Sequence, residues 1–296
     1  MKTLHDIPLN QSPSAWDLLT NPNRVGVFQY GVDQGFPFLN QRAFELHPEP
    51  GTDRNGETCL FRIDTLDHVL SAIQHRKLWL PQPSAWEDPW EDPVWRYLEK
   101  EHRRYSDSVE YDCFALCWSK ESSCEALWRR LKNKGRLVQI KTTVEKLLSS
   151  ITISLNDIVN AQEQFFLNPV FYMDPEEELT FRSEIDRALK DVDSHVNHDL
   201  VRILSLFVKR HYFEYEKEYR LVFRLHHSKR DKAADHYDLN LCPETMIESV
   251  QIDPWCGDYE YEMIEKSFEL MSIQCNRSDL AKPMWNDTSS HSSSGD

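Results

Sequence analysis

The sequence predicts an α+β fold with a central mixed or antiparallel sheet flanked by helices. Short segments with strand-like alternation are interleaved with segments whose apolar residues recur at helical spacing. The chain has 296 residues, of which 40% are hydrophobic, so it can bury a sizeable core. We find no internal repeat that would indicate a solenoid or propeller.

Charge and composition exclude several classes of protein. The net charge of -15 gives no overall attraction for nucleic acid or anionic membranes. The chain lacks a G-x-G-x-x-G fingerprint, a phosphate loop and an H-E-x-x-H motif. Its start is polar, no run of about 18 apolar residues occurs, and the 7 cysteines form no Cys-x-x-Cys. We therefore expect a reduced, cytoplasmic protein that does not act at a membrane.

Composition divides the chain into three regions. Residues 1–57 are rich in Pro, Asn and Gln and are expected to form an irregular N-terminal arm. Residues 58–275 carry the periodic segments and are expected to form the folded domain. Residues 276–296 end in a Ser-rich stretch and are expected to be a flexible C-terminal tail.

The first half of the domain opens with a strand at 58–63 and a helix at 66–75, capped by Asp64 or Thr65. At 111–119, Phe114, Leu116 and Trp118 alternate with smaller residues, which predicts a buried strand. The other elements expected here are a strand at 78–80, a helix at 94–105, a helix from Ser122 or Ser123 to Leu131, a strand at 136–141 and a helix at 144–149 capped by Thr142 or Thr143.

The second half continues the same alternation of strands and helices. The helix expected at 195–212 has apolar residues at helical spacing, from Leu200 to Val208. The other elements expected here are strands at 170–172, 215–223, 237–241 and 247–252, and helices at 176–190 and 259–271.

The segment 215–223 holds the most informative pair of residues. Glu216 and Glu218 are two positions apart, so in a strand both carboxylates point to the same face. Like charges held this close repel, so a fold retains the pair where something favours it. A cationic substrate is one candidate, and proton transfer is another.

Two further polar residues interrupt or end apolar strands, namely Arg62 and Ser119. On separate strand ends, they and Glu218 can converge on one cleft. An Arg grips a diphosphate with two parallel hydrogen bonds, and a Ser holds a hydroxyl or orients the Arg. A Glu bonds a ribose hydroxyl and stabilises an oxocarbenium-like centre.

This order of Arg, Ser and Glu-x-Glu on three strands resembles the ADP-ribosyltransferase superfamily in its arginine–serine–glutamate subclass, and distantly its DarT-type toxins. The chain also resembles a broad set of uncharacterised bacterial domains related to that superfamily. The resemblance implies a split sheet. It covers about residues 58–255 through blocks at 78–80 with 86–89, 113–119 with 127–128, 170–172 and 215–220. The middle motif, Trp118-Ser119-Lys120, departs from the usual Ser-Thr-Ser.

The resemblance implies an enzyme that uses NAD as a substrate and needs no metal. Arg62 would bind the diphosphate and Ser119 would position Arg62 or the nicotinamide ribose. Glu218 would stabilise the transition state, and Glu216 would orient or deprotonate the acceptor. Trp86 would line the cleft and stack on a base or on nicotinamide. The implied acceptor is RNA, DNA or protein. The implied setting is a toxin–antitoxin or anti-phage system, with an antitoxin protein as partner.

Other interpretations stay open at this point. Glu216 and Glu218 could lie on a solvated strand edge beside Lys217 and Arg220, and Arg62 could be a structural residue paired with Asp64 or Asp67. Trp86 could belong to a tight turn instead of a cleft. The basic segment 128–141 could contact nucleic acid or an acidic partner, or be a solvated helix face. The chain could be an inactive nucleotide- or partner-binding module of the same fold, or a metal-dependent hydrolase.

Overall fold

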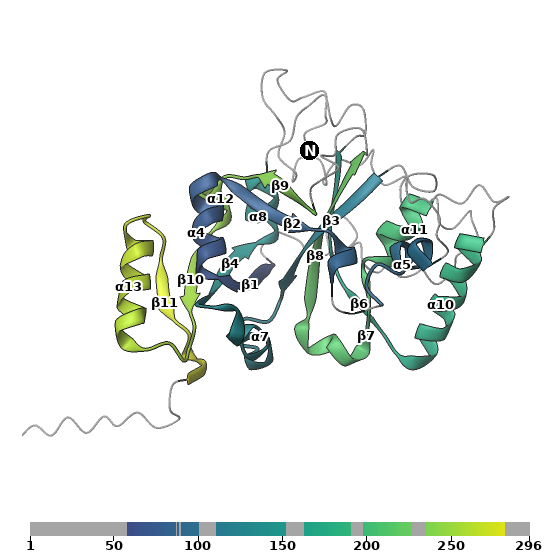
Figure 1. The fold of residues 1–296 in the computed structure, drawn as a ribbon. Helices are drawn as coiled ribbons and strands as arrows, with labels where there is room; N and C mark the ends of the chain where they lie inside the picture. Colours follow the sequence, from purple (N-terminus) through teal and green to yellow (C-terminus); the bar gives the residue numbers. More distant parts are fainter. Residues whose placement is uncertain are drawn as a thin grey trace, which may run out of the picture.

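A computed structural model describes residues 58–86, 88, 90–100, 111–151, 163–190, 198–226 and 235–281. The predicted arm at 1–57 lies outside these ranges. A seven-stranded sheet runs through the centre, in the order β11-β10-β4-β1-β3-β8-β5, and is antiparallel except between β10 and β11 (Figure 1). Its strands are β1 (Cys59–Thr65), β3 (Tyr111–Ser119), β4 (Leu137–Thr143), β5 (Glu163–Pro169), β8 (Glu218–His226), β10 (Ser249–Ile252) and β11 (Cys275–Arg277).

The central sheet is split between β1 and β3. These two strands pair only where Phe61 lies opposite Ser119, whereas β1 follows β4, and β3 follows β8, along their whole lengths. Two small sheets accompany the main one. They are the antiparallel pair β2 (Lys77–Pro81) and β9 (His236–Asn240), and the parallel pair β6 (Phe171–Met173) and β7 (Val208–Arg210).

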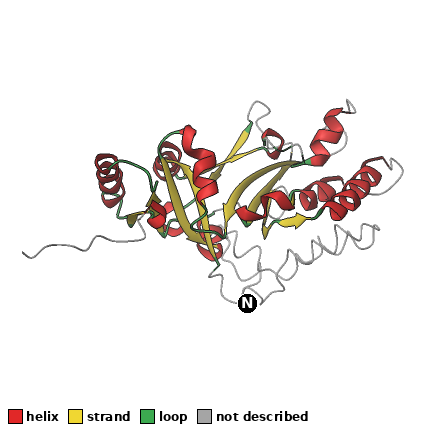
Figure 2. Ribbon diagram, turned by 90° about the horizontal axis from the view of Figure 1, so that it is seen from below, coloured by secondary structure: helices red, strands yellow, loops and turns green. Residues whose placement is uncertain are grey.

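Helices cover both faces of the central sheet (Figure 2), so the predicted α+β class is confirmed. The helices are α4 (Leu66–His75), α5 (Pro93–Lys100), α7 (Glu125–Leu131), α8 (Val144–Ser150), α10 (Pro175–Lys190), α11 (His198–Ser205), α12 (Pro243–Met246) and α13 (Asp258–Glu269). Short 3-10 turns lie at Pro83–Ala85, Lys132–Lys134, His211–Glu216 and Asp279–Ala281. Within the described ranges, no helix is both long and apolar enough to cross a membrane.

Alternation along β3 divides the core between the two faces of the sheet. Phe114, Leu116 and Trp118 pack into the larger cluster, beneath α4, α8, β2 and β9. Cys113 and Ala115 point the other way, into a smaller cluster with residues of α11 and β8. Because both faces are covered, β3 is apolar along nearly its whole length, as the sequence predicted.

Several boundaries differ from the sequence prediction. The expected helix at 195–212 ends at Ser205, because the chain then turns and Val208–Arg210 pairs with β6 as β7. Cys124, not a serine, precedes α7. Strands β5 and β11 were not predicted. Residues 276–281, assigned to the tail, contain the end of β11 and a 3-10 turn, so the fold extends past the predicted boundary.

The cap of α8 gives a first testable result. Thr143 Oγ1 accepts a hydrogen bond from the Lys146 amide at 3.2 Å, as predicted for an N-cap. We expect Thr143→Ala to lower the free energy of unfolding by about 1 kcal/mol in urea titrations, because the amide loses its partner. Thr143→Ser keeps the hydroxyl and should lose less than half as much. Equal losses in the two variants would rule out the capping bond as the cause.

Candidate functional site

Glu216 and Glu218 do not lie in one strand, so that part of the prediction is wrong. Glu216 ends a 3-10 turn and β8 begins at Glu218, because Lys217 between them adopts a left-handed conformation with φ of 41°. The two carboxylates still meet, since Lys209 Nζ donates to Glu216 Oε2 at 2.8 Å and to Glu218 Oε2 at 3.0 Å. An ammonium group between them offsets the repulsion that made the pair notable.

The carboxylate of Glu218 is engaged on both oxygens. Arg220 Nε donates to Oε1 at 2.6 Å and Arg220 Nη2 to Oε2 at 3.2 Å. Arg220 and Lys209 both also contact the Glu91 carboxylate. We call Glu91, Lys209, Glu216, Glu218 and Arg220 the buried charge network, because none of them is more than 7% exposed. The alternative in which Glu216 and Glu218 lie on a solvated strand edge is therefore wrong, although Arg220 is a partner of Glu218.

The network holds Glu218, Lys209 and Arg220 in their charged forms. Burial raises the pKa of Glu218, but the charges of Arg220 and Lys209 outweigh it and lower that pKa to about 2. For Lys209 and Arg220, burial lowers the pKa and the neighbouring carboxylates more than reverse this, so both pKa values lie above their usual ranges. At neutral pH, Glu218 is thus an ionised and buried carboxylate with a cation bound to each oxygen.

The described residues between the 3-10 turn Pro83–Ala85 and α5, namely 86, 88 and 90–92, lie against this face of the sheet. Glu91 binds the network, Asp88 binds Arg210, and Asp92 binds Arg202 at 2.6 Å. Each acid therefore pairs with a cation on β7, β8 or α11.

Trp86 also lies over this face of the sheet. Its ring lies 4.6 Å from the Arg220 guanidinium and packs against the smaller core cluster. Trp86 thus lies over Arg220 of the network, directly after the 3-10 turn Pro83–Ala85, and does not line the cavity described below.

Ser119 lies opposite Glu218 in the β3–β8 ladder. Its hydroxyl donates to the Glu216 carbonyl at 2.7 Å and accepts from the Glu121 amide at 2.9 Å. These bonds fix the turn that follows β3 against the turn that precedes β8. Ser119 does not contact Arg62.

Arg62 lies on the opposite face of the sheet from Glu218, so the predicted convergence of Arg62 with Ser119 and Glu218 is wrong. Phe61 pairs with Ser119, and Ser119 pairs with Glu218, so these three side chains share one face. Arg62 is one residue further along β1 and points the other way. Its neighbour in the ladder is Ile140, which belongs to the larger core cluster.

The Arg62 guanidinium bridges the split in the sheet. Nη1 donates to the Cys117 carbonyl on β3 at 2.9 Å, and Nη2 donates to Asp64 Oδ2 at 2.7 Å. Asp64 also accepts from the Thr65 amide and contacts the His68 ring at 2.9 Å. The pairing of Arg62 with Asp64, one of the alternatives left open by the sequence, is confirmed.

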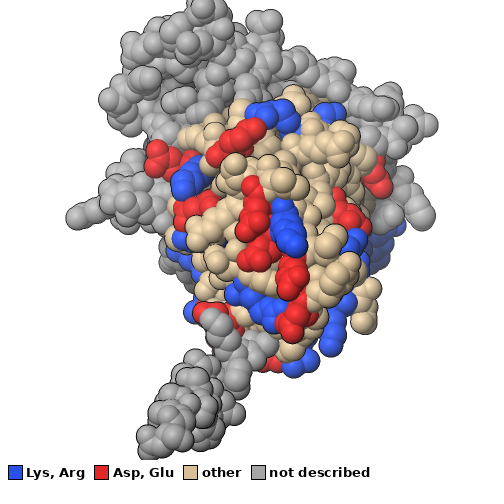
Figure 3. Space-filling view, turned by 90° about the vertical axis from the view of Figure 1, so that its left-hand side faces the viewer, with Lys and Arg blue, Asp and Glu red and all other residues tan. Residues whose placement is uncertain are grey.

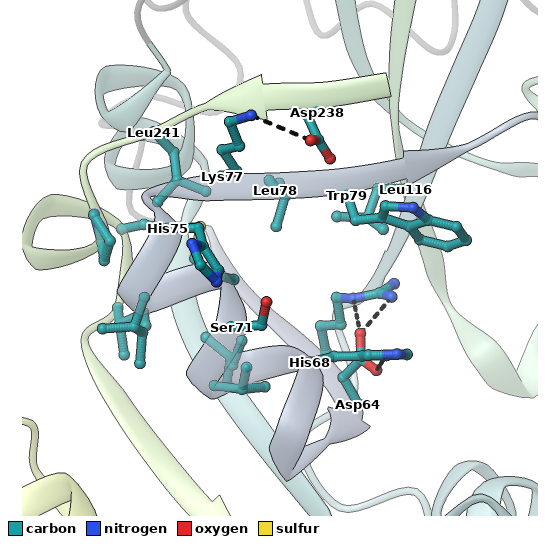
Figure 4. A pocket seen from close by; sticks show the side chains of 18 residues that line it. Asp64, His68, Ser71, His75, Lys77, Leu78, Trp79, Leu116, Asp238 and Leu241 are labelled. Atoms are coloured by element: carbon teal, nitrogen blue, oxygen red, sulfur yellow. Dashed lines mark hydrogen bonds and ion pairs between the residues drawn. The ribbon is translucent and has the colours of Figure 1, made fainter. Parts of the chain in front are cut away.

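A cavity of about 460 Å³ opens beside Arg62, between α4, β2, β9 and α12 (Figure 4). Its volume lies in the range of small-molecule sites. Ser71 and His75 point from α4 toward the cavity, and Lys77 pairs with Asp238 at its edge. The apolar part of the lining consists of Val69, Ala72, Ile73, Leu78, Leu116, Ile140, Leu241, Pro243, Met246 and Ile247.

Trp79 is the aromatic residue of this cavity, and the sequence analysis did not single it out. Its side chain stays 48% exposed while Leu78 and Leu80 on either side are buried. The ring lies 6.5 Å from the His68 ring and 5.2 Å from the His236 ring, centroid to centroid. Strand alternation could have identified Trp79 from the sequence, because it places Trp79 on the opposite side of β2 from Leu78 and Leu80.

The basic segment 128–141 is largely paired with acids. Arg129 contacts Glu125 and the Trp255 ring, while Arg130 donates to Glu216 Oε1 at 2.8 Å. The face of the molecule nearest α13 shows basic and acidic residues interspersed (Figure 3). Within the described ranges, no group of three His, Cys, Asp or Glu side chains could hold a metal ion.

Comparison with known proteins adds a distant likeness among solved structures. No family model matches the chain, and no curated protein matches it. The fold is similar to a solved structure of Thermus sp. 2.9 DarT in complex with NAD+, over 75% of this chain and 96% of that one. The sequence identity is 10% and the TM-score is 0.28, so the likeness assigns no role to any residue.

Proposed function

We propose that this chain binds a nucleotide of the NAD class in the cavity beside Arg62. The observation that carries the proposal is the cavity itself, which combines an apolar lining with an exposed Trp79 ring and a charged edge. A flat base or nicotinamide ring packs on such a surface. Lys77 offers a cation to phosphate oxygens, with the charge of Arg62 beside it, and Asp238 accepts hydrogen bonds from ribose hydroxyls.

The activity that the sequence resemblance attaches to such binding is ADP-ribosyl transfer. We propose an RNA, DNA or protein acceptor, in a toxin-like setting with an antitoxin-type partner. This part of the proposal rests on the ordered sequence blocks and not on the geometry of Glu218.

One observation favours a second function, nucleotide binding without catalysis. Glu218 is 3% exposed, both its oxygens are occupied, and it lies on the face of the sheet away from Arg62. To act on NAD, the Glu218 carboxylate would have to break its hydrogen bonds with Arg220 and Lys209. Labelled NAD incubated with cell lysate separates the two functions. Label entering RNA, DNA or protein supports transfer, and bound but unconsumed NAD supports the binding module.

Calorimetry with NAD tests the binding step. We expect Trp79→Ala to weaken the Kd for NAD about tenfold or more, because aromatic stacking contributes about 1–3 kcal/mol per base. Trp255→Ala is the matched control, since Trp255 is also partly exposed, at 38%, but lies outside the cavity. No binding at millimolar NAD, or equal weakening in both variants, would contradict the proposal.

A further inference from the structure

The cavity holds a carboxylate–histidine pair that the sequence analysis did not consider. His68 Nδ1 lies 2.9 Å from Asp64 Oδ1, and the His68 side chain is 69% exposed at the cavity. Asp64 is held from two other directions. Arg62 donates to Oδ2 through Nε at 3.2 Å and Nη2 at 2.7 Å, and the Thr65 amide donates to Oδ1 at 2.8 Å. The carboxylate that orients His68 is therefore fixed in place.

The charge state of Asp64 determines which ring nitrogen of His68 is available. Burial raises the pKa of Asp64, but Arg62, His68 and the Thr65 amide together lower it below the usual range. An ionised carboxylate only accepts hydrogen bonds, so Nδ1 of His68 carries the hydrogen. In the neutral ring, Nε2 then holds the free lone pair. This arrangement of acid and imidazole is the one that general-base histidines use.

A second carboxylate–histidine pair, His236 with Asp235 at 2.8 Å, also lies beside Trp79. Its carboxylate is 87% exposed and is held by no other side chain among the described residues, and His236 Nε2 faces Asp238 at 3.7 Å. The His236 ring is therefore less firmly oriented, and its Nε2 is less available, than that of His68. The carboxylates of Glu216 and Glu218 are occupied by cations on the far face of the sheet. Asp238, at the cavity, is paired with Lys77. His68 also lies beside the Trp79 ring, where a bound aromatic group would pack. A ligand on Trp79 would thus be within reach of Nε2.

We infer that His68 is the proton acceptor of the cavity and that Asp64 is its positioning residue. The inference rests on the proposed binding of an NAD-class nucleotide. In the reaction, the oxygen of water or of an acceptor hydroxyl forms a bond to C1′ of the nicotinamide ribose. The C1′–N bond breaks, and its electron pair leaves with neutral nicotinamide. The proton of the attacking hydroxyl moves to His68 Nε2.

The test measures nicotinamide release from NAD by the full chain, with and without cell lysate, and NAD affinity by calorimetry in parallel. We expect His68→Gln to bind NAD within about threefold of the parent and to lose release about 10²- to 10⁴-fold. His226→Gln is the matched control, because it makes the same substitution at a histidine that ends β8 and lies outside the cavity. Its release rate should stay within about threefold of the parent.

A pH profile separates positioning from folding. Asp64→Asn should move the acidic limb of kcat/KM to lower pH, because a neutral amide stabilises the imidazolium less than a carboxylate does. The other charged or titratable groups around His68 and Trp79 stay unchanged, namely Arg62 on β1, Lys77 on β2, His236 and Asp238 on β9, and Asp235, which precedes β9 and pairs with His236.

The outcomes that overturn the inference differ from those that overturn binding. His68→Gln releasing nicotinamide at the parental rate would overturn the role of His68. A parent that binds NAD but never releases nicotinamide would also overturn it, and would leave the binding proposal intact. A parent that does not bind NAD would overturn both.

Discussion

Replacing Arg220 by methionine is expected to lower the free energy of unfolding by about 3–5 kcal/mol, because it removes one partner of a buried ionic group. The Arg220 side chain is fully buried and donates to Glu218, to Glu91 and to the Leu206 carbonyl. In the variant, three buried carboxylates, those of Glu91, Glu216 and Glu218, would share the ammonium of Lys209, and Arg130 would remain as a second cation at Glu216 only. The transfer of the methionine side chain from water offsets only part of that penalty.

Urea unfolding followed by circular dichroism measures this loss. The control is Arg129→Met, which breaks an exposed pair with Glu125 and should cost about 0–1 kcal/mol. A loss in Arg220→Met no larger than in Arg129→Met would show that the buried charge network does not stabilise the fold.

The second large expected effect is a loss of folding stability at low pH, when Glu218 becomes protonated. Its pKa in the folded chain is about 2, against an ordinary value of 4.5, a depression of about 2.5 units. A carboxyl group whose pKa is depressed in the folded chain stabilises the fold at pH values above its pKa in the unfolded chain. This contribution is lost as the pH falls from about 4.5 to 2. At about 1.4 kcal/mol per unit, the loss is on the order of 3 kcal/mol.

Unfolding free energies at a series of pH values test this expectation. Glu218→Gln cannot titrate, so its stability should fall less steeply than that of the parent between pH 4.5 and 2. Glu244→Gln is the control, because Glu244 forms an exposed pair with Arg76. Identical slopes for the parent and Glu218→Gln would contradict the assignment of the low pKa.

The spacing of apolar residues predicted the elements whose structure depends mainly on residues near one another in the sequence. The strand at Tyr111–Ser119 and the helix at Leu66–His75 have the predicted bounds, since alternation and helical spacing each specify a buried face. The helix expected through residue 212 failed because Val208–Arg210 pairs with β6, a tertiary contact that spacing along the chain does not encode.

The candidate site was predicted in part. Glu216, Glu218, Ser119 and Trp86 do lie together, but as a closed structural cluster whose cations come from β7, β8 and α7. Arg62 was assigned to the wrong face because the register between β1 and β3 depends on the Phe61–Ser119 pair, which no sequence motif marks. The left-handed Lys217, which separates the two carboxylates, carries no glycine or asparagine signal either.

These positions divide the chain into two functional parts. The buried charge network joins Glu91 to β7 and β8 on one face, where it holds the fold together. The cavity beside Arg62 lies on the other face, with Trp79 and His68 at its opening. The central claim is that the nucleotide binds in this cavity and that the network does not touch it.

A crystal structure of the full chain with NAD tests this claim most directly. The account predicts electron density for the nucleotide between α4 and β2, with a ring against Trp79 and with Glu218 still bound to Arg220 and Lys209. Nucleotide density on the opposite face, in contact with a Glu218 carboxylate released from those two cations, would contradict it.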